Sequence, residues 1–296
     1  MTAAGLVDAL LQQGVELWAD GDRLRFNAPR GTMTPTLRQQ LADRKAELLQ
    51  FLQSRQTVTP MAPPPIRAVP RDGALPLSFL QQRLWFLDRL QPGNSANSIP
   101  VALRLSGSLD VAALEHCLNT IAGRHEILRT SVGMASGRPV QVIEPEIHLK
   151  LPVVDLCHVP EHRREAAAIA WAREEGRQPF DLARAPLLRV TLLRLAPDEH
   201  VLVLVTHHFV ADGWSINVLQ QEIGLLYTAV SRNMPATLPP LPVQFADYAA
   251  WQRQWVQGDV LDVQLSYWKQ QLAGSLPLLD LPADRPRPPV QTFEGA

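Results

Sequence analysis

The sequence predicts an α+β fold made of two unlike parts that a proline-rich segment separates. Stretches in which apolar and polar residues alternate, as in strands, are interspersed with stretches in which apolar residues recur every three or four positions, as in helices. Five prolines between residues 57 and 74 interrupt both patterns. With 296 residues, 46% of them hydrophobic, the chain is long enough to build more than one core.

Residues 1–56 form the first part, for which we expect an αββα arrangement. Residues 5–13 have the pattern of a short helix. Residues 15–26 alternate like two strands, and Asp20-Gly21-Asp22 between them is a hairpin turn signal. The first part therefore begins with a helix and a β-hairpin.

A longer helix is expected to close the first part. Thr34 followed by Pro35 is typical of a helix start, with threonine as the cap and proline in the first turn. Leucines then recur on one helical stripe, at Leu37, Leu41, Leu48 and Leu52. A unit of this size is near the lower limit for a stable core, so docking or dimerising would stabilise it, although a small domain without a partner is the simpler alternative.

Residues 57–74 are expected to form an extended, semi-rigid tether between the two parts. The segment has almost no apolar periodicity. Its prolines are Pro60, Pro63, Pro64, Pro65 and Pro70.

Residues 75–275 form the second part, in which strands and helices are mixed. The expected elements are a strand at 99–105, a helix at 114–121 that Gly123 ends, a strand pair at 125–132 and 138–143, a helix at 161–176, and a strand at 187–195 that Pro197-Asp198-Glu199 turns back. Residues 201–205 are uninterruptedly apolar, which predicts a strand covered on both faces. Residues 216–230 then follow a helical stripe, so residues 209–214 should form the loop between strand and helix.

Composition and charge exclude several kinds of partner. The formal net charge is -1 at pH 7 with both signs interspersed, so the chain lacks the positive field that binds nucleic acid or an anionic membrane. No apolar stretch approaches the ~20 residues needed to span a bilayer. The two cysteines, Cys117 and Cys157, fit neither a disulfide framework nor a metal site. We therefore expect a cytoplasmic protein with no metal site.

The expected central strand leads directly to His207 and His208. Adjacent side chains of an extended chain point to opposite faces, so one ring should face a cavity and the other the interior. Asp212 can hold the following loop through an ion pair, and Gly213 permits a tight turn close to a substrate. Taken alone, the two histidines fit a structural pair as well as a catalytic base.

Further motifs accompany the histidines in a fixed order. They are Leu77-Ser78 with Gln82-Arg83-Leu84-Trp85, Arg124-His125-Glu126 with Leu128-Arg129-Thr130, Pro179-Phe180-Asp181-Leu182, the run from Thr206 to Ser215, and Asp247-Tyr248 with Trp251. Through these motifs the second part resembles the amino-terminal lobe of nonribosomal peptide synthetase condensation domains. The resemblance implies a fold like that of chloramphenicol acetyltransferase.

The resemblance extends to both ends of the chain. Residues 276–296, with Asp284-Arg285-Pro286-Arg287-Pro288, look like the start of the segment between the two lobes of a condensation domain. The carboxy-terminal lobe is then expected to be absent. Residues 1–56 look like the N-terminal docking domains of tubulysin-type assembly lines, which seat one synthetase subunit on another. An upstream subunit and a second copy of the docking domain are the partners this implies.

The same resemblance implies an amide-forming acyltransferase. A donor acyl or peptidyl thioester and an acceptor aminoacyl thioester would arrive on the phosphopantetheine arms of two carrier proteins, with no cofactor bound directly. The histidines, unlike the aspartate-based motif of heterocyclising relatives, favour ordinary condensation, and the motifs favour an L-configured donor over epimerisation. By itself this chain is expected to be inactive.

Family roles can be carried onto single residues of the motif. His208 is implied as the catalytic residue, which orients the acceptor amine and takes its proton, or acts as general base alone. His207 is implied as a buried structural histidine. Asp212 would pair with Arg129, or less well with Arg83. Gly213 would present its N–H to a developing oxyanion or simply adopt unusual backbone angles.

Two other functions remain open at this point. An acetyltransferase that uses diffusible coenzyme A would share the histidine motif, but it would gain nothing from a docking part and a tether. A chain with one lobe could also serve only to dock within a larger synthetase.

Overall fold

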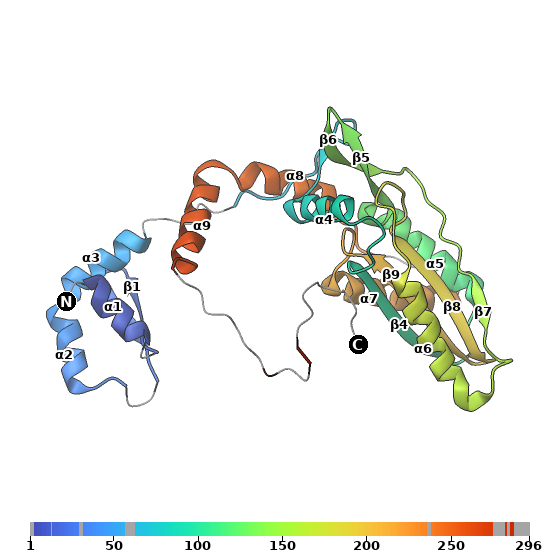
Figure 1. Cartoon of the computed structure of the whole chain (residues 1–296), viewed down its shortest axis with the longest axis horizontal. Helices are drawn as coiled ribbons and strands as arrows, with labels where there is room; N and C mark the ends of the chain where they lie inside the picture. Colours follow the sequence, from blue (N-terminus) through green and yellow to red (C-terminus); the bar gives the residue numbers. More distant parts are fainter. Residues whose placement is uncertain are drawn as a thin grey trace. The chain divides into compact units, whose positions relative to one another are not determined.

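The computed structural model describes residues 3–12, 14–29, 32–56, 63–235, 238–274, 282 and 285–286. The expected interlobe segment at 276–296 lies almost entirely outside them, as does the first third of the expected tether. The described residues form two compact units that divide after Pro63 (Figure 1). The predicted mixture of helices and strands, an α+β fold, is confirmed. No helix in these ranges is long and apolar enough to cross a membrane.

The first unit contains the expected helix and hairpin. Its elements are α1 (Ala3–Gln12), β1 (Glu16–Asp20), β2 (Arg23–Asn27), α2 (Pro35–Asp43) and α3 (Lys45–Gln56). Gly21 makes the hairpin turn with a φ of 58°, a conformation that glycine adopts without strain. Apolar side chains from the helices and the hairpin meet in one core, which includes Leu6, Leu10, Val15, Leu41 and Leu48.

The single helix expected after Thr34 is divided in two at Arg44. Thr34 caps α2 as expected, but Arg44 has a φ of -109° and a ψ of 16°, which lie outside helical geometry. The Arg44 guanidinium is paired with Glu47 at 2.7 Å at the start of α3. Leu41 and Leu48 are buried on either side of the break, so their spacing did not reveal it.

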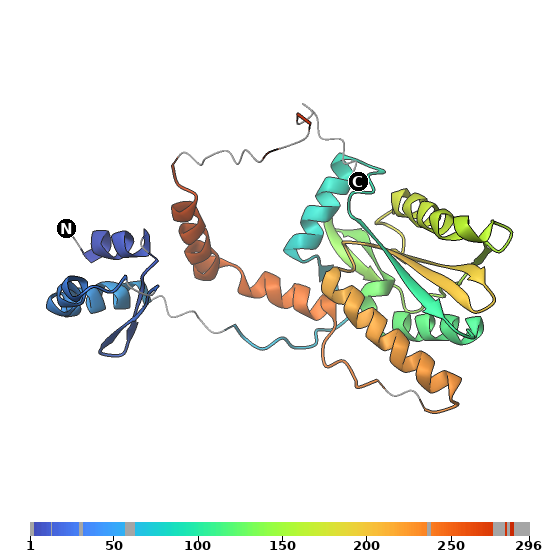
Figure 2. The same ribbon diagram turned by 90° about the horizontal axis from the view of Figure 1, so that it is seen from below.

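The second unit is built on a four-stranded sheet in the order β4, β9, β8, β7. These strands are β4 (Ser98–Ser106), β7 (Val153–Asp155), β8 (Leu188–Ala196) and β9 (Glu199–His207). β9 pairs antiparallel with β4 and β8, whereas β7 is parallel to β8. Helices α5 (Val111–Arg124) and α7 (Gly213–Ser231) cover one face, and α6 (Glu161–Arg177) covers the other (Figure 2).

Strand β9 is covered on both faces, as its continuous apolar run predicts. Leu202 and Leu204 pack in the core on the side of α5 and α7. Val203 and Val205 pack on the side of α6. All four are at most 1% exposed. The last residue of this strand is His207, so the histidines stand at the end of the most buried element of the unit.

A smaller sheet and several helices complete the second unit. They are β3 (Leu75–Pro76), α4 (Phe79–Leu90), the 3₁₀ turn η1 (Glu126–Arg129), β5 (Thr130–Ala135), β6 (Arg138–Ile143), α8 (Phe245–Trp255) and α9 (Gly258–Gln271). The small sheet has the order β3, β6, β5. Gly123 lies inside α5 and does not end it, because the helix continues to Arg124.

The strand expected at 125–132 begins only at Thr130, because η1 precedes it. Both backbone groups of Glu126 are occupied by side chains in this turn. Its N–H donates to the side-chain oxygen of Gln244 at 3.1 Å, and its carbonyl accepts from the Thr130 hydroxyl at 2.7 Å. Neither group is then free for a strand ladder.

Candidate functional site

The first histidine of the motif, His207, is buried. Its side chain follows the alternation of β9 toward the α6 side and is 4% exposed. Its Nδ1 accepts the backbone N–H of Phe209 at 3.0 Å, and the Phe180 ring meets it edge-on with centroids 6.1 Å apart. Burial lowers the pKa of His207 to about 4, and the neighbouring His208 acts in the same direction. The imidazole is therefore neutral at pH 7 and serves as a hydrogen-bond acceptor inside the fold.

The second histidine, His208, is exposed, while its backbone is fixed on two sides. Its N–H donates to the carbonyl of Asn97 at 2.8 Å. The carbonyl of His207 accepts the N–H of Val210 at 2.9 Å, which closes a tight turn around His208. The imidazole makes no hydrogen bond to any other described residue. A fixed backbone with a free ring suits a group that must meet a substrate.

A buried glutamine that the sequence reasoning missed supports this turn. Gln81 is 1% exposed, and its Nε2 donates to the carbonyl of Phe209 at 3.4 Å. Its Oε1 accepts the N–H of Ser78 at 3.0 Å, while the Ser78 hydroxyl accepts the N–H of Gln81. This reciprocal capping box starts α4, and the pattern Ser-x-x-Gln is a signal that could have identified the residue.

Asp212 caps helix α7. Its Oδ1 accepts the N–H of Ser215 at 2.8 Å and the Ser215 hydroxyl at 2.6 Å. The serine hydroxyl in turn accepts the N–H of Asp212 at 3.2 Å. These hydrogen bonds from Ser215 hold the pKa of Asp212 below its usual range. The carboxylate thus fixes the start of α7 directly after the turn at residues 207–210, here called the histidine turn.

The expected ion pair between Asp212 and Arg129 is not formed. The guanidinium of Arg129 donates to the carbonyl of Glu144, and its buried Nε has no partner among the described residues. Arg83, the second candidate, is exposed on α4. The reason is local: a serine three residues after Asp212 satisfies the carboxylate within its own helix turn.

Gly213 is the first residue of α7 and does not adopt a left-handed backbone conformation. A Cβ added there would meet nothing within 4 Å. The expectation that this glycine is needed for unusual backbone angles is therefore wrong. As the first helical residue, it carries one of the N–H groups that have no partner inside a helix.

A mostly apolar cavity of about 220 Å³ lies beside the histidine turn. It is lined by Val210 and Ala211 of the loop, Ile216 and Leu219 of α7, and Ile127 and Leu128 of η1. Trp214, also part of the lining, is 79% exposed. Because Val210 and Ala211 follow His208 closely in the sequence, the cavity offers a substrate an apolar surface next to the histidine turn.

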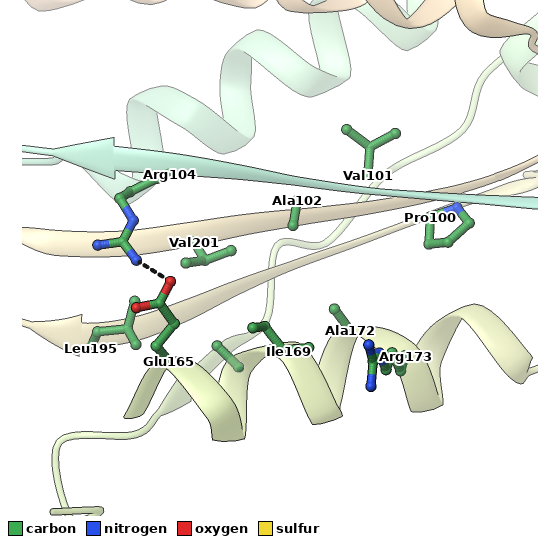
Figure 3. Close-up of a pocket in the computed structure, with 11 residues that line it drawn as sticks. Pro100, Val101, Ala102, Arg104, Glu165, Ile169, Ala172, Arg173, Leu195 and Val201 are labelled. Carbon is green, nitrogen blue, oxygen red and sulfur yellow. Dashed lines mark ion pairs between the residues drawn. The ribbon is translucent and has the colours of Figure 1, made fainter. Parts of the chain in front are cut away.

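A second hollow, of about 320 Å³, lies between α6 and the edge strand β4 (Figure 3). Its walls are mostly apolar, and the ion pair between Arg104 and Glu165, at 3.1 Å, lies at one end. It contains neither motif histidine. We therefore place the candidate site at the histidine turn and not in this larger hollow. Within the described ranges, no group of three or more histidine, cysteine, aspartate or glutamate residues could hold a metal ion.

Two family models match the chain. The model described as the condensation domain matches residues 71–296, and the model described as the TubC N-terminal docking domain matches residues 4–54.

Known synthetases are similar in sequence. One of the linear gramicidin synthase proteins of Brevibacillus parabrevis is 52% identical over 231 residues, which are 78% of this chain and 3% of that protein. Phosphinothricin tripeptide synthetase PhsC of Streptomyces viridochromogenes is 43% identical over 239 residues, which are 79% of this chain and 22% of that protein. The chain thus spans a small part of these relatives.

Solved structures are similar in fold. The complex of the X-domain and OxyB from teicoplanin biosynthesis aligns with a TM-score of 0.64 and 35% identity, over 77% of this chain and 50% of that one. A structure on condensation domain-mediated chain release from the enacyloxin polyketide synthase aligns with a TM-score of 0.60 and 26% identity, over 94% and 53%. The chain covers about half of each solved protein.

The buried state of His207 predicts how stability depends on pH. An unfolded histidine titrates near 6.5, whereas folded His207 does so at about 4. Between these two pH values the histidine is protonated in the unfolded state but not in the folded state. The free energy of unfolding therefore decreases as the pH falls, by up to about 3 kcal/mol. Thermal melting of the second unit should therefore depend less on pH in His207→Asn, which keeps an acceptor for Phe209. His148→Asn, at a side chain 66% exposed, is the control; equal pH slopes in all three proteins would contradict the prediction.

The cap on α7 predicts a second set of variants. Asp212→Ala should destabilise the second unit by about 1 kcal/mol, and Asp212→Ser by less, because serine also caps helices. With no ion pair to Arg129, the effects of Asp212→Ala and Arg129→Met should add in the double variant. Thermal or denaturant unfolding measures the wild type and the four variants. A coupling energy above about 0.5 kcal/mol would indicate that Asp212 and Arg129 do interact and would contradict the prediction.

Proposed function

Because the chain belongs to the condensation-domain family and carries a TubC-type docking domain, we propose that its second unit forms amide bonds between two carrier-bound substrates. Condensation domains are acyl-transferring catalysts, and the expected chloramphenicol-acetyltransferase-like fold is confirmed. In the proposed reaction a donor acyl or peptidyl thioester and an acceptor aminoacyl thioester, each on the phosphopantetheine arm of a carrier protein, meet at His208 in the cytoplasm.

The observation that carries this proposal is the contrast between the two histidines. His207 is neutral and buried, so it adds no positive charge next to the reacting groups. His208 is exposed on a turn whose backbone is fixed by Asn97 and Val210. An imidazole carried on such a backbone can accept a hydrogen bond from an amine and later its proton.

The proposed reaction balances without a cofactor bound to this chain. The acceptor amine attacks the carbonyl carbon of the donor thioester and forms the C–N bond. His208 accepts the amine proton as the tetrahedral intermediate forms or collapses. The C–S bond then breaks, and the sulfur leaves on the arm of the donor carrier and receives a proton.

Positioning is expected to contribute more than base strength. An α-amine has a pKa near ~8, so keeping it neutral at pH 7 costs about 1 kcal/mol. Holding two reactants in the right geometry can contribute roughly 7 to 11 kcal/mol. The turn around His208, supported by Gln81 and by the cap at Asp212, serves this positioning. A role of His208 as general base alone is the simpler rival.

The first unit supports the docking part of the proposal. A groove of about 390 Å³ lies between β2 and the helices α2 and α3. Four cationic residues line it, namely Arg23, Arg25, Arg38 and Lys45, together with the half-exposed Phe26. Within the described residues β2 pairs only with β1, so its other edge offers free backbone groups. We assign this groove to an acidic segment of the upstream synthetase subunit.

Amide formation from two loaded carriers tests the catalytic proposal. The assay compares this chain with a version extended past Ala296, each with His208 and with His208→Ala. The extended protein should form the amide, and His208→Ala should lower the rate about 10²-fold or more. A fall of less than about tenfold would exclude proton transfer by His208 as part of the mechanism. Acyl transfer from free coenzyme A would favour the acetyltransferase alternative, and failure of both lengths would refute the assigned catalysis.

Charge reversal tests the docking proposal. The double variant Arg23→Glu and Arg38→Glu should weaken binding of the upstream subunit about tenfold or more, and added salt should weaken the wild-type complex. Calorimetry measures both effects, with Arg163→Glu on the exposed face of α6 as the control. Unchanged affinity would exclude the groove as the binding site of the upstream subunit. Loss of a homodimer in the same variant would instead make the groove a surface for self-association.

A further inference from the structure

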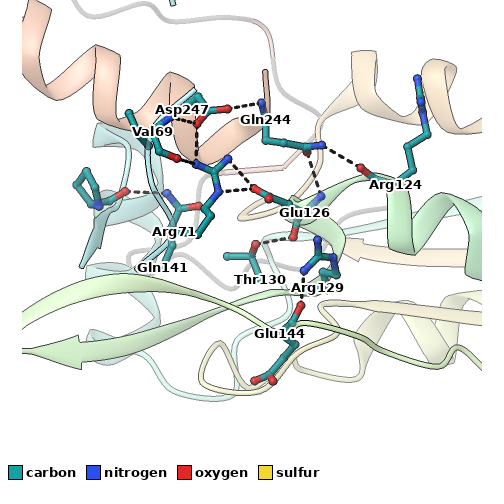
Figure 4. A network of polar contacts seen from close by, with 11 residues as sticks. Val69, Arg71, Arg124, Glu126, Arg129, Thr130, Gln141, Glu144, Gln244 and Asp247 are labelled. Atoms are coloured by element: carbon teal, nitrogen blue, oxygen red, sulfur yellow. Dashed lines mark hydrogen bonds and ion pairs between the residues drawn. The ribbon is translucent and has the colours of Figure 1, made fainter. Parts of the chain in front are cut away.

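The end of the expected tether lies against the second unit. Residues 64–71, here called the strap, lie against α8 and are held near both ends, and Figure 4 shows the contacts of Val69 and Arg71 at the second end. The indole Nε1 of Trp251 donates to the carbonyl of Pro64 at 2.6 Å. The N–H of Val69 donates to Asp247 Oδ1 at 2.9 Å. The strap therefore belongs to the second unit.

Arg71 joins the strap to two separate elements. Its guanidinium donates to Asp247 Oδ1 of α8 at 2.7 Å and to Glu126 Oε2 of η1 at 2.9 Å. It also donates to the carbonyl of Val69 at 2.5 Å, within the strap itself. The planar, multiply donating guanidinium suits this role, and a lysine ammonium would not reproduce it.

The partner on α8 is deeply buried. Asp247 is 1% exposed. Burial alone would raise its pKa, but the hydrogen bonds from Arg71 and from the backbone of Gln244 and Val69 outweigh burial and lower the pKa. Loss of Arg71 would leave this carboxylate near Glu126 without the cation that now lies between them. The strap would lose its ion pairs to α8 and η1, and α8 would keep a buried charge that destabilises the remaining contacts.

Apolar packing contributes little to the attachment. A cavity of about 240 Å³ lies between the strap and α8, lined by Pro64, Pro65, Arg67 and Val69 on one side and by Asp247, Trp251 and Gln254 on the other. Most strap side chains are exposed. The polar contacts at Pro64, Val69 and Arg71 are therefore the contacts that hold it.

We infer that Arg71 is a positioning residue that fastens the strap to α8 and so sets the length of chain connecting the docking domain to the catalytic unit. With the strap attached, about seven residues, 57–63, remain between the units, and these can span at most about 25 Å. With the strap detached through residue 74, about eighteen residues can span at most about 65 Å. This effect on docking rests on the proposed function, whereas the attachment itself does not.

Limited trypsin digestion tests the attachment without an activity assay. The bond after Arg67 lies within the strap. In the full-length protein it should be cut at least about tenfold faster in Arg71→Met and in Asp247→Asn than in the wild type, because the detached strap is open to protease. Arg163→Met, at an exposed residue of α6, is the matched loss of an arginine and should leave this rate unchanged. Equal rates in all four proteins would overturn the inference.

A second variant covers the case in which Arg71→Met fails to fold. Trp251→Phe removes the donor to Pro64 and keeps an aromatic ring to stack on Tyr248, whose centroid lies 5.8 Å from that of the indole. It should give a smaller increase in cleavage after Arg67. Thermal melting confirms that each variant is folded before digestion. If Trp251→Phe folds and leaves the cleavage rate at the wild-type value, the strap is not held as inferred.

Kinetics with the donor carrier on a separate upstream protein test the consequence. Arg71→Met should raise the apparent KM for that protein by up to about fourfold, the fall in effective concentration expected when a connector lengthens from about seven to about eighteen residues. The rate at saturating upstream protein should stay unchanged, because Arg71 does not contact the histidine turn. A lower saturating rate with an unchanged KM would indicate that Arg71 supports the active site. It would contradict the inference that Arg71 sets the length of the connecting chain. An inactive wild type with normal strap protection would refute the proposed catalysis and leave the attachment intact.

Discussion

Burial of β9 on both faces is the constraint on which the rest of the site depends. A strand that is covered by α5 and α7 on one side and by α6 on the other cannot shift its register by one residue without exposing its apolar side chains. The register in turn decides which histidine is enclosed. His207 takes the inward position. The strand ends at His207, so His208 lies outside the sheet and is exposed.

The histidine turn is held by hydrogen bonds that come from several elements. Asn97 precedes β4, Gln81 lies in the first turn of α4, and Asp212 caps α7. Two of these residues belong to capping boxes, which are local devices for satisfying helix ends. Here the same devices help to fix the backbone that carries an exposed imidazole. This arrangement agrees with a mechanism in which geometry outweighs the basicity of the ring.

Patterns that depend on neighbours in the sequence were predictable. The continuous apolar run at 201–205 indicated β9, and Asp20-Gly21-Asp22 indicated the hairpin of the first unit. Contacts that depend on tertiary structure were not predictable in the same way. The Asp212–Arg129 pair was inferred from family resemblance, but Ser215 already satisfies the carboxylate. The capping role of Gln81 follows a local pattern, but its hydrogen bond to the carbonyl of Phe209, far along the chain, was not predictable. The catalytic role of His208 itself stays a prediction.

The attachment of the strap to α8 bears on where synthetases can be recombined. A junction placed at the end of the proline-rich segment, near residue 74, would take Arg71 from one parent and Asp247 from another. The hybrid would then depend on whether two unrelated sequences happen to supply a matching cation and buried carboxylate. A junction between residues 57 and 63 leaves the whole polar network within one parent. For the protein engineer, the proline-rich segment thus contains two regions: residues 57–63, where a junction can be placed, and residues 64–74, which should be kept together with the second unit.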